Sequence, residues 1–193
     1  MTPRKTMSYL AAACSLALIL GCQQPAGDMM AEGPPPRPAE LDQLNDWAGT
    51  WNGTGEMIMH TPKGEQKMTT TGKETAKWVC DNRVLMSEME YDMGDMGKMT
   101  GISIATYDKN SKKFRSYWFD SMGTVGHGEM WKDPSTGMWM MKTKGTDPMS
   151  GDATSGKGTV KMLDPNTMEW TFTEYDGWGF NKKVEMKGTS RKM

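Results

Sequence analysis

Three turn motifs of one kind recur in the second half of the chain and limit it to short, closely connected elements. Residues 133–137 read Asp-Pro-Ser-Thr-Gly, residues 147–151 read Asp-Pro-Met-Ser-Gly, and residues 164–167 read Asp-Pro-Asn-Thr. In such a turn the Asp accepts backbone N–H bonds, the Pro presets φ at the second position, and the Gly tolerates a left-handed exit. A chain interrupted this often has no room for long helices, so we predict strands joined by tight turns.

Between the turns, apolar and polar side chains alternate with a period of two, which is the pattern of half-buried strands. Met168, Trp170 and Phe172 share one face of a strand, whereas Glu169 and Thr171 share the other. Ten sequential strands favour an all-β, up-and-down antiparallel sheet that closes into a barrel, because closure leaves no unpaired edge. The ten strands are predicted near residues 50–59, 66–79, 83–92, 98–107, 113–120, 126–132, 138–145, 157–163, 167–175 and 181–191.

One short helix is predicted over residues 40–47, before the first strand. Leu41, Leu44 and Trp47 fall on one face of it, and Pro38 stands near its start. Because the segment makes barely two turns, it must dock on another element to persist.

The N-terminus has the pattern of a secretory signal, with Arg4 and Lys5 before an apolar run over residues 8–20. That run is shorter than the roughly 20 residues that span a bilayer. It ends in Ile-Leu-Gly before Cys22, which resembles a lipoprotein signal box in which the thiol is lipidated before cleavage; a plain signal peptide is the alternative. Gln23 rather than Asp follows, and in the usual bacterial sorting pattern this favours the outer membrane, facing the periplasm.

The resulting organisation has three parts. We expect a lipoprotein signal peptide over 1–21, the lipidated Cys22 and a tether over 22–39, and a barrel domain over 40–193. The tether is rich in proline, which gives a stiff, extended chain that would hold the domain off a membrane surface.

Two further segments resemble known families. Gly-Thr-Trp at residues 49–51 is similar to the Gly-x-Trp signature of lipocalin-like barrels, in which the Trp closes one end of the barrel. Gly-Ile-Ser-Ile-Ala-Thr-Tyr-Asp at 101–108, followed by Lys-Phe-Arg-Ser-Tyr-Trp-Phe-Asp-Ser-Met-Gly-Thr at 113–124, resembles the core of the bacterial family called domain of unknown function 1579. The resemblance covers roughly residues 40 to 193. It implies a lipocalin-like barrel, usually secreted or lipid-anchored, and it brings no agreed activity and no catalytic residues.

The inner face of such a barrel is the candidate ligand site. We predict that Trp51, Trp118, Asp120, Trp170 and Phe172 contact a small apolar or amphipathic molecule, with Asp120 orienting any polar group. An interior filled by its own side chains would instead indicate a structural or interaction domain.

Methionine is unusually frequent, with 22 in 193 residues. Packing is its common role, because its flexible side chain fills irregular gaps. Met86, Met89, Met93, Met96 and Met99, however, surround a Gly-rich hairpin loop in which no core is expected for Met93 and Met96. Thioethers are soft ligands that suit Cu(I), so these five residues form a candidate metal site.

Composition excludes several function classes. A formal net charge of −1 argues against a nucleic-acid partner. With only His60 and His127, a zinc site or a histidine-based catalytic site is not expected. Haem ligation by one histidine inside the barrel is an alternative. The sequence contains no nucleophile elbow, phosphate-binding loop or calcium loop, so we expect a binding protein rather than an enzyme, and its oligomeric state stays open.

Overall fold

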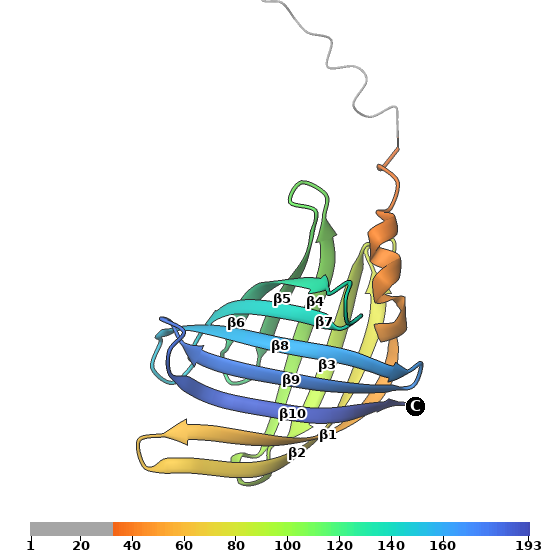
Figure 1. Ribbon diagram of the computed structural model, residues 1–193. Coiled ribbons are helices and arrows are strands. Elements are labelled where there is room, and N and C mark those ends of the chain that lie inside the picture. Colours follow the sequence, from red (N-terminus) through yellow and green to blue (C-terminus); the bar gives the residue numbers. More distant parts are fainter. Residues whose placement is uncertain (1–32) are drawn as a thin grey trace, which may run out of the picture. The chain divides into compact units, whose positions relative to one another are not determined.

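Ten antiparallel strands pair in sequence order, and the last strand pairs with the first, so the sheet closes into a barrel (Figure 1). The computed structural model describes residues 33–193, and residues Arg37–Met193 form one unit. The predicted all-β, up-and-down antiparallel barrel is therefore confirmed. The strands are β1 Gly49–Thr61, β2 Gly64–Val79, β3 Val84–Asp92, β4 Lys98–Asp108, β5 Lys113–Asp120, β6 Val125–Lys132, β7 Trp139–Thr146, β8 Ala153–Asp164, β9 Thr167–Asp176 and β10 Lys182–Lys192.

The barrel closes along the seam between β1 and β10. Their pairing runs from Trp51 opposite Lys192 to Met59 opposite Val184. The Met193 backbone N–H extends it by donating to the Thr50 carbonyl oxygen at 2.9 Å. The seam satisfies the backbone groups that an open sheet would leave unpaired at its two edges.

A 3₁₀ helix, η1 Ala39–Trp47, covers the end of the barrel where β1 begins and where the C-terminus also lies (Figure 1). It buries Leu41 and Leu44, which are 1% and 0% exposed. The Trp51 indole N–H donates to the Trp47 carbonyl oxygen at 2.9 Å and ties the helix to the first strand. The predicted helix thus forms at its predicted place, and docking supplies the stability that so short a helix lacks alone.

We call this end the sealed end, because the buried apolar side chains gather there. Trp139 is central to it: its ring meets those of Trp47 and Phe114 edge-on, with centroids 5.6 and 5.0 Å apart. The opposite end, where the hairpins β1–β2, β3–β4, β5–β6, β7–β8 and β9–β10 turn, is the open end. The buried cluster comprises Leu41, Leu44, Trp51, Ala76, Leu85, Ala105, Phe114, Met130, Trp139, Val160 and Met168.

One strand boundary differs clearly from the prediction. β8 begins at Ala153, four residues before the predicted start at residue 157. Its first half contains mostly Thr, Ser and Gly, which carry no apolar signal, yet Thr154 and Gly156 pair with both β7 and β9. Neighbouring strands on both sides, rather than local propensity, impose the extended conformation here.

The predicted signal peptide over 1–21, Cys22 and most of the predicted tether lie outside the described residues. Within residues 33–193, no helix is long and apolar enough to span a bilayer.

Candidate functional site

The strand register places Trp118, Trp170 and Phe172 on the inner face of the barrel, as predicted. They share that face with the buried residues Phe114 and Met168, which are two or four positions away on the same strands. All three aromatic side chains are nevertheless partly exposed. An inner side chain of a closed sheet is reached by solvent mainly through the interior. Away from the sealed end, the inner aromatic side chains are therefore less completely buried than those of the cluster at the sealed end.

Atoms of these rings lie close to glycines on neighbouring strands. A Cβ atom at Gly188 would overlap the Trp170 ring, and one at Gly55, which pairs with Gly188 across the seam, would lie 2.9 Å from its Cη2 atom. The missing side chains let the ring pack against the sheet wall. The same arrangement recurs for Trp118 on Gly101, Phe172 on Gly156 and Tyr91 on Gly72. We refer to Trp118, Trp170 and Phe172 as the aromatic wall.

Two indole N–H groups of the aromatic wall are held in place by polar side chains. Trp170 Nε1 donates to Ser190 Oγ at 3.1 Å, and Trp118 Nε1 donates to Asp120 Oδ2 at 2.8 Å. Asp120 Oδ1 also accepts the backbone N–H groups of Met122 and Thr124, each at 3.0 Å. Asp120 therefore faces the interior as predicted. Its carboxylate accepts one hydrogen bond from Trp118 and two from the β5–β6 turn, which leaves few lone pairs free to bind a ligand.

Trp51 was predicted as a ligand contact, but the structure places it in the sealed end. It is 1% exposed, and the Lys192 ammonium covers its ring at 5.1 Å from the centroid. Because η1 folds over it, Trp51 offers no surface to a molecule in the interior.

Glu74 is an inner residue that the sequence interpretation did not single out. It stands opposite Met89 and shares the inner face of β2 with Gly72 and Ala76. Burial raises the pKa of its carboxyl, and a hydrogen bond with the Ser87 hydroxyl opposes part of that rise. Burial also raises the pKa of Tyr91, and the nearby charge of Glu74 adds to it. Strict alternation along 66–79 would have placed Glu74 inside.

A second group of carboxyls meets near the open end. Burial raises the pKa of Glu174 on β9, and the negative charges of Asp147 and Asp120 raise it further, whereas Lys183 lowers it. Asp120 belongs to β5, so strands on different sides of the barrel contribute to one electrostatic region. Lys183 Nζ pairs with Asp147 Oδ2 at 2.5 Å, and Thr154 Oγ1 donates weakly to Glu174 at 3.5 Å.

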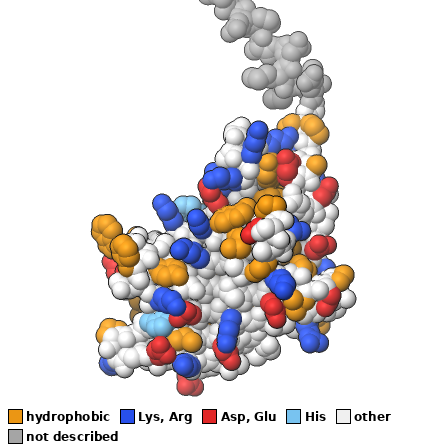
Figure 2. All heavy atoms as spheres, in the orientation of Figure 1, with side chains coloured by type: hydrophobic (Ala, Val, Ile, Leu, Met, Phe, Trp, Pro, Cys, Tyr) orange, Lys and Arg blue, Asp and Glu red, His pale blue; other side chains and the backbone are white. Residues whose placement is uncertain are grey.

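The loops at the open end expose large apolar side chains. Met149 in the β7–β8 loop is 88% exposed, and Trp178 and Phe180 in the β9–β10 loop are 86% and 82% exposed. Figure 2 shows hydrophobic side chains projecting at the left edge of the molecule, over the ends of β9 and β10. These three residues form an apolar rim beside the acidic region described above.

The five methionines proposed as a metal site do not share one face. Met86 and Met89 are three positions apart on β3 and so point to opposite faces, Met89 to the inside. Met99 also points inward, whereas Met96 in the β3–β4 loop is exposed. Met93 is only 5% exposed, so the expectation that it lacks a core was wrong; the loop folds as a short 3₁₀ helix, η2 Gly94–Met96. A soft-metal site at these five methionines stays a prediction, although Met86 and Met96 lie apart from the inward-facing members.

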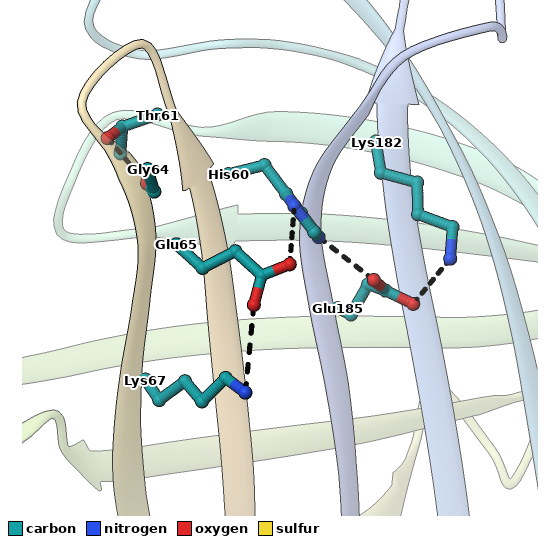
Figure 3. Close-up of polar contacts among 7 residues, drawn as sticks. All are labelled: His60, Thr61, Gly64, Glu65, Lys67, Lys182 and Glu185. Atoms are coloured by element: carbon teal, nitrogen blue, oxygen red, sulfur yellow. Dashed lines mark hydrogen bonds and ion pairs between the residues drawn. The ribbon is translucent and has the colours of Figure 1, made fainter.

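Both histidines lie outside the interior. His60, on the outer face of β1, lies between Glu65 and Glu185 in a charge network across the seam (Figure 3). Its Nε2 is 2.9 Å from Glu185 Oε1, and its Nδ1 is 3.8 Å from Glu65 Oε1. Hydrogen bonds from Lys182 and His60 lower the pKa of Glu185. His127 is exposed on β6, so neither residue is placed to ligate a haem inside the barrel.

The outer surface also carries an open depression of about 1030 Å³ over β1–β5. Polar side chains such as Lys73, Glu88, Glu90 and Lys98 form much of its lining. Lys98 Nζ pairs with Glu90 Oε1 at 2.7 Å, so opposite charges largely neutralise each other here. Phe119 and Asp120 lie at one end of the lining, so the depression has few aromatic side chains.

Comparisons with known proteins agree with this architecture. The structure is similar to that of Rv2717c from M. tuberculosis, with a TM-score of 0.61 at 10% sequence identity over 82% of this chain and 99% of that one. It is also similar to the S-type phycobiliprotein lyase CPES from Guillardia theta, with a TM-score of 0.54 at 11% identity over 81% of this chain and 94% of that one. At such identities the similarity shows a common fold. A search of curated proteins found no match.

The resemblance found in the sequence, carried by the segments at 101–108 and 113–124, is confirmed by a family model. That model, described as a protein of unknown function, DUF1579, matches residues 38–190, which span the barrel almost from η1 to the end of β10. The chain therefore belongs to the DUF1579 family.

Proposed function

We propose that this protein binds a small apolar or amphipathic molecule inside the barrel, without catalysing a reaction on it. The proposal rests mainly on one observation. The aromatic wall on the inner face of the barrel is partly exposed, whereas the side chains at the sealed end are buried. Ligand sites in proteins typically combine apolar and aromatic walls with a few well-placed polar groups. The inner face offers both, because it carries the aromatic wall and also Glu74 and Ser87, which share a hydrogen bond.

The test fills the interior with one side chain. At Gly126 on β6, a Cβ atom would lie 3.8 Å from Trp118 Cβ and 3.5 Å from the Lys144 carbonyl oxygen, so the first atom of a side chain meets no clash, and the register directs it inward beside Trp118. We expect Gly126→Phe to bind the neutral apolar dye Nile red about tenfold more weakly than the unsubstituted protein, a loss of about 1.4 kcal/mol. Fluorescence titration measures this affinity.

His127→Phe provides the matched control, since it adds the same ring to the next residue of β6 on the outer face. It is expected to leave Nile red affinity unchanged. Equal weakening by both variants would place the dye outside the barrel. Failure of the unsubstituted protein to bind the dye would favour a structural or interaction domain with a filled interior.

We further infer that the mature protein is anchored to the outer membrane through a lipid on Cys22 and faces the periplasm. Support comes from the order of basic residues, apolar run, Gly21 and Cys22 in the sequence. The proline-rich segment that follows suits a spacer between membrane and barrel.

A cysteine substitution tests the anchor. We expect Cys22→Ser to move most of the protein from the membrane fraction to the soluble fraction of a bacterial host, because the acylated thiol is lost. Cys80→Ser is the control, since Cys80 is an exposed free thiol in the β2–β3 turn, and it should leave the distribution unchanged. Immunoblotting of both fractions gives the result. A Cys22→Ser protein that stays with the membranes would contradict the anchor.

A further inference from the structure

The accessible part of the interior is acidic. Three carboxylates face it from different sides: Glu74 on β2, Asp120 on β5 and Glu174 on β9. The cation near them, Lys183 at the β10 bulge, is already paired with Asp147 at 2.5 Å. The interior therefore has an excess of negative charge between its two ends.

The other charged residues in the inner register lie at strand ends: Lys132 is exposed at the end of β6 opposite Trp139, and two others have separate tasks. Asp176, at the end of β9, accepts the Phe180 N–H and the Asn181 side-chain amide and so shapes the β9–β10 loop. At the sealed end, Lys192 covers Trp51 and donates to the Asp46 carbonyl oxygen at 3.3 Å. Neither residue neutralises the acids in the middle of the barrel.

Two of the three interior carboxylates are poorly satisfied by the protein itself. Asp120 accepts three N–H groups, whereas Glu74 has a hydrogen bond with Ser87 and Glu174 has a weak one from Thr154. Neither Glu74 nor Glu174 forms an ion pair with any residue between 33 and 193. A buried carboxylate with so few partners is costly, and the cost falls when an opposite charge joins it.

The walls around these carboxylates suit a cation as well. Aromatic faces attract an ammonium or guanidinium group through their quadrupole, and more strongly where water is excluded. Trp118, Trp170, Phe172 and Tyr91 all belong to this inner face, and ring atoms of each lie close to a glycine of a neighbouring strand. Carboxylates and aromatic rings thus favour the same class of group.

We propose that the interior selects a cationic amphipathic ligand, with an apolar body against the aromatic wall and an ammonium or guanidinium group bound by Glu74, with Glu174 and Asp120 adding attraction near the open end. This inference rests on the proposed function, because it requires a molecule inside the barrel. Beyond the proposed function, the inference specifies that the ligand is positively charged and that Glu74 binds its charged group. The apolar rim of Met149, Trp178 and Phe180 gives such a molecule an apolar entry to an acidic interior.

The test uses three probes with one apolar body and different charges: 1-naphthylmethylamine, 1-naphthalenemethanol and 1-naphthoate. Calorimetric titration of the full barrel at pH 7 should rank the cation above the alcohol, and the alcohol above the anion. We expect the cation to bind about tenfold more tightly than the alcohol, as is typical of a hydrogen bond to a charged group.

Glu74→Gln should remove most of that preference while leaving the affinity for the alcohol within about twofold of the unsubstituted protein, because shape and polarity are kept. Glu90→Gln, on the outer face of β3, should change neither. Because burial disfavours the charged form of Glu74, Glu74→Gln should melt at the same temperature or higher at pH 7, and this difference should vanish as the pH falls below the ordinary pKa of a glutamate.

The results distinguish a failure of the charge preference from a failure of ligand binding itself. If the cation and the alcohol bind equally, or the anion binds best, the charge preference is overturned while ligand binding stands. A preference that survives both Glu74→Gln and Glu174→Gln overturns the assignment of the acids. If neither Nile red nor any naphthyl probe binds, the proposed function itself fails.

Discussion

Replacing Trp51 with alanine is expected to lower the free energy of unfolding by about 3–5 kcal/mol, the range found when a large buried aromatic side chain is truncated. Trp51 is 1% exposed and donates its indole N–H to the Trp47 carbonyl oxygen. The substitution therefore removes packing at the sealed end and one of the contacts that hold η1 to β1. Urea unfolding followed by circular dichroism would measure the change.

Trp178→Ala is the matched control, because Trp178 is 86% exposed in the β9–β10 loop. Removing an exposed side chain usually changes stability by less than about 0.5 kcal/mol. Similar losses for Trp51→Ala and Trp178→Ala would mean that the sealed end does not carry the stability assigned to it.

Gly188→Ala is expected to destabilise the barrel by about 1–3 kcal/mol, the usual cost of overpacking. The added methyl group would lie 2.5 Å from the Thr54 carbonyl oxygen and would overlap the Trp170 ring. Trp170 is also tied to Ser190 through its indole N–H, and the Thr54 oxygen belongs to the backbone, so neither neighbour moves away easily. Thermal unfolding would measure the loss, and a shift in tryptophan emission would report displacement of the ring.

Gly126→Ala controls for the general cost of replacing an inner glycine. Its methyl group would meet nothing closer than 3.5 Å, so we expect little loss of stability. If Gly126→Ala and Gly188→Ala were equally destabilising, close packing of the ring on the wall would not explain the glycine at 188.

The fold followed from local signals because turns and alternation are properties of adjacent residues. Each Asp-Pro turn lies where two strands meet, and period-two alternation identified the inner faces of β5 and β9. The start of β8 was missed because its Thr, Ser and Gly residues carry no such signal. There the extended conformation depends on two neighbouring strands rather than on the segment itself.

The site was less accessible to sequence reasoning, because it depends on which residues of different strands stand opposite one another. Trp170 lies over Gly55 and Gly188, which come from β1 and β10, and local patterning contains no information about that register. Burial of Trp51 depends on the docking of η1. Glu74 is different: alternation alone would have placed it inside, and its charge made it easy to read as a surface residue.

The seam between β1 and β10 also decides when the protein can become a barrel. The first strand pairs early with β2, but its second partner is β10, the tenth strand along the chain, since Trp51 pairs with Lys192 and Thr50 accepts from Met193. Such distant pairings are slow to form, because loop closure must precede them. A chain still emerging from the ribosome therefore keeps an unclosed sheet, and a copy that lost even its final strand would leave two exposed edges ready to pair with other chains.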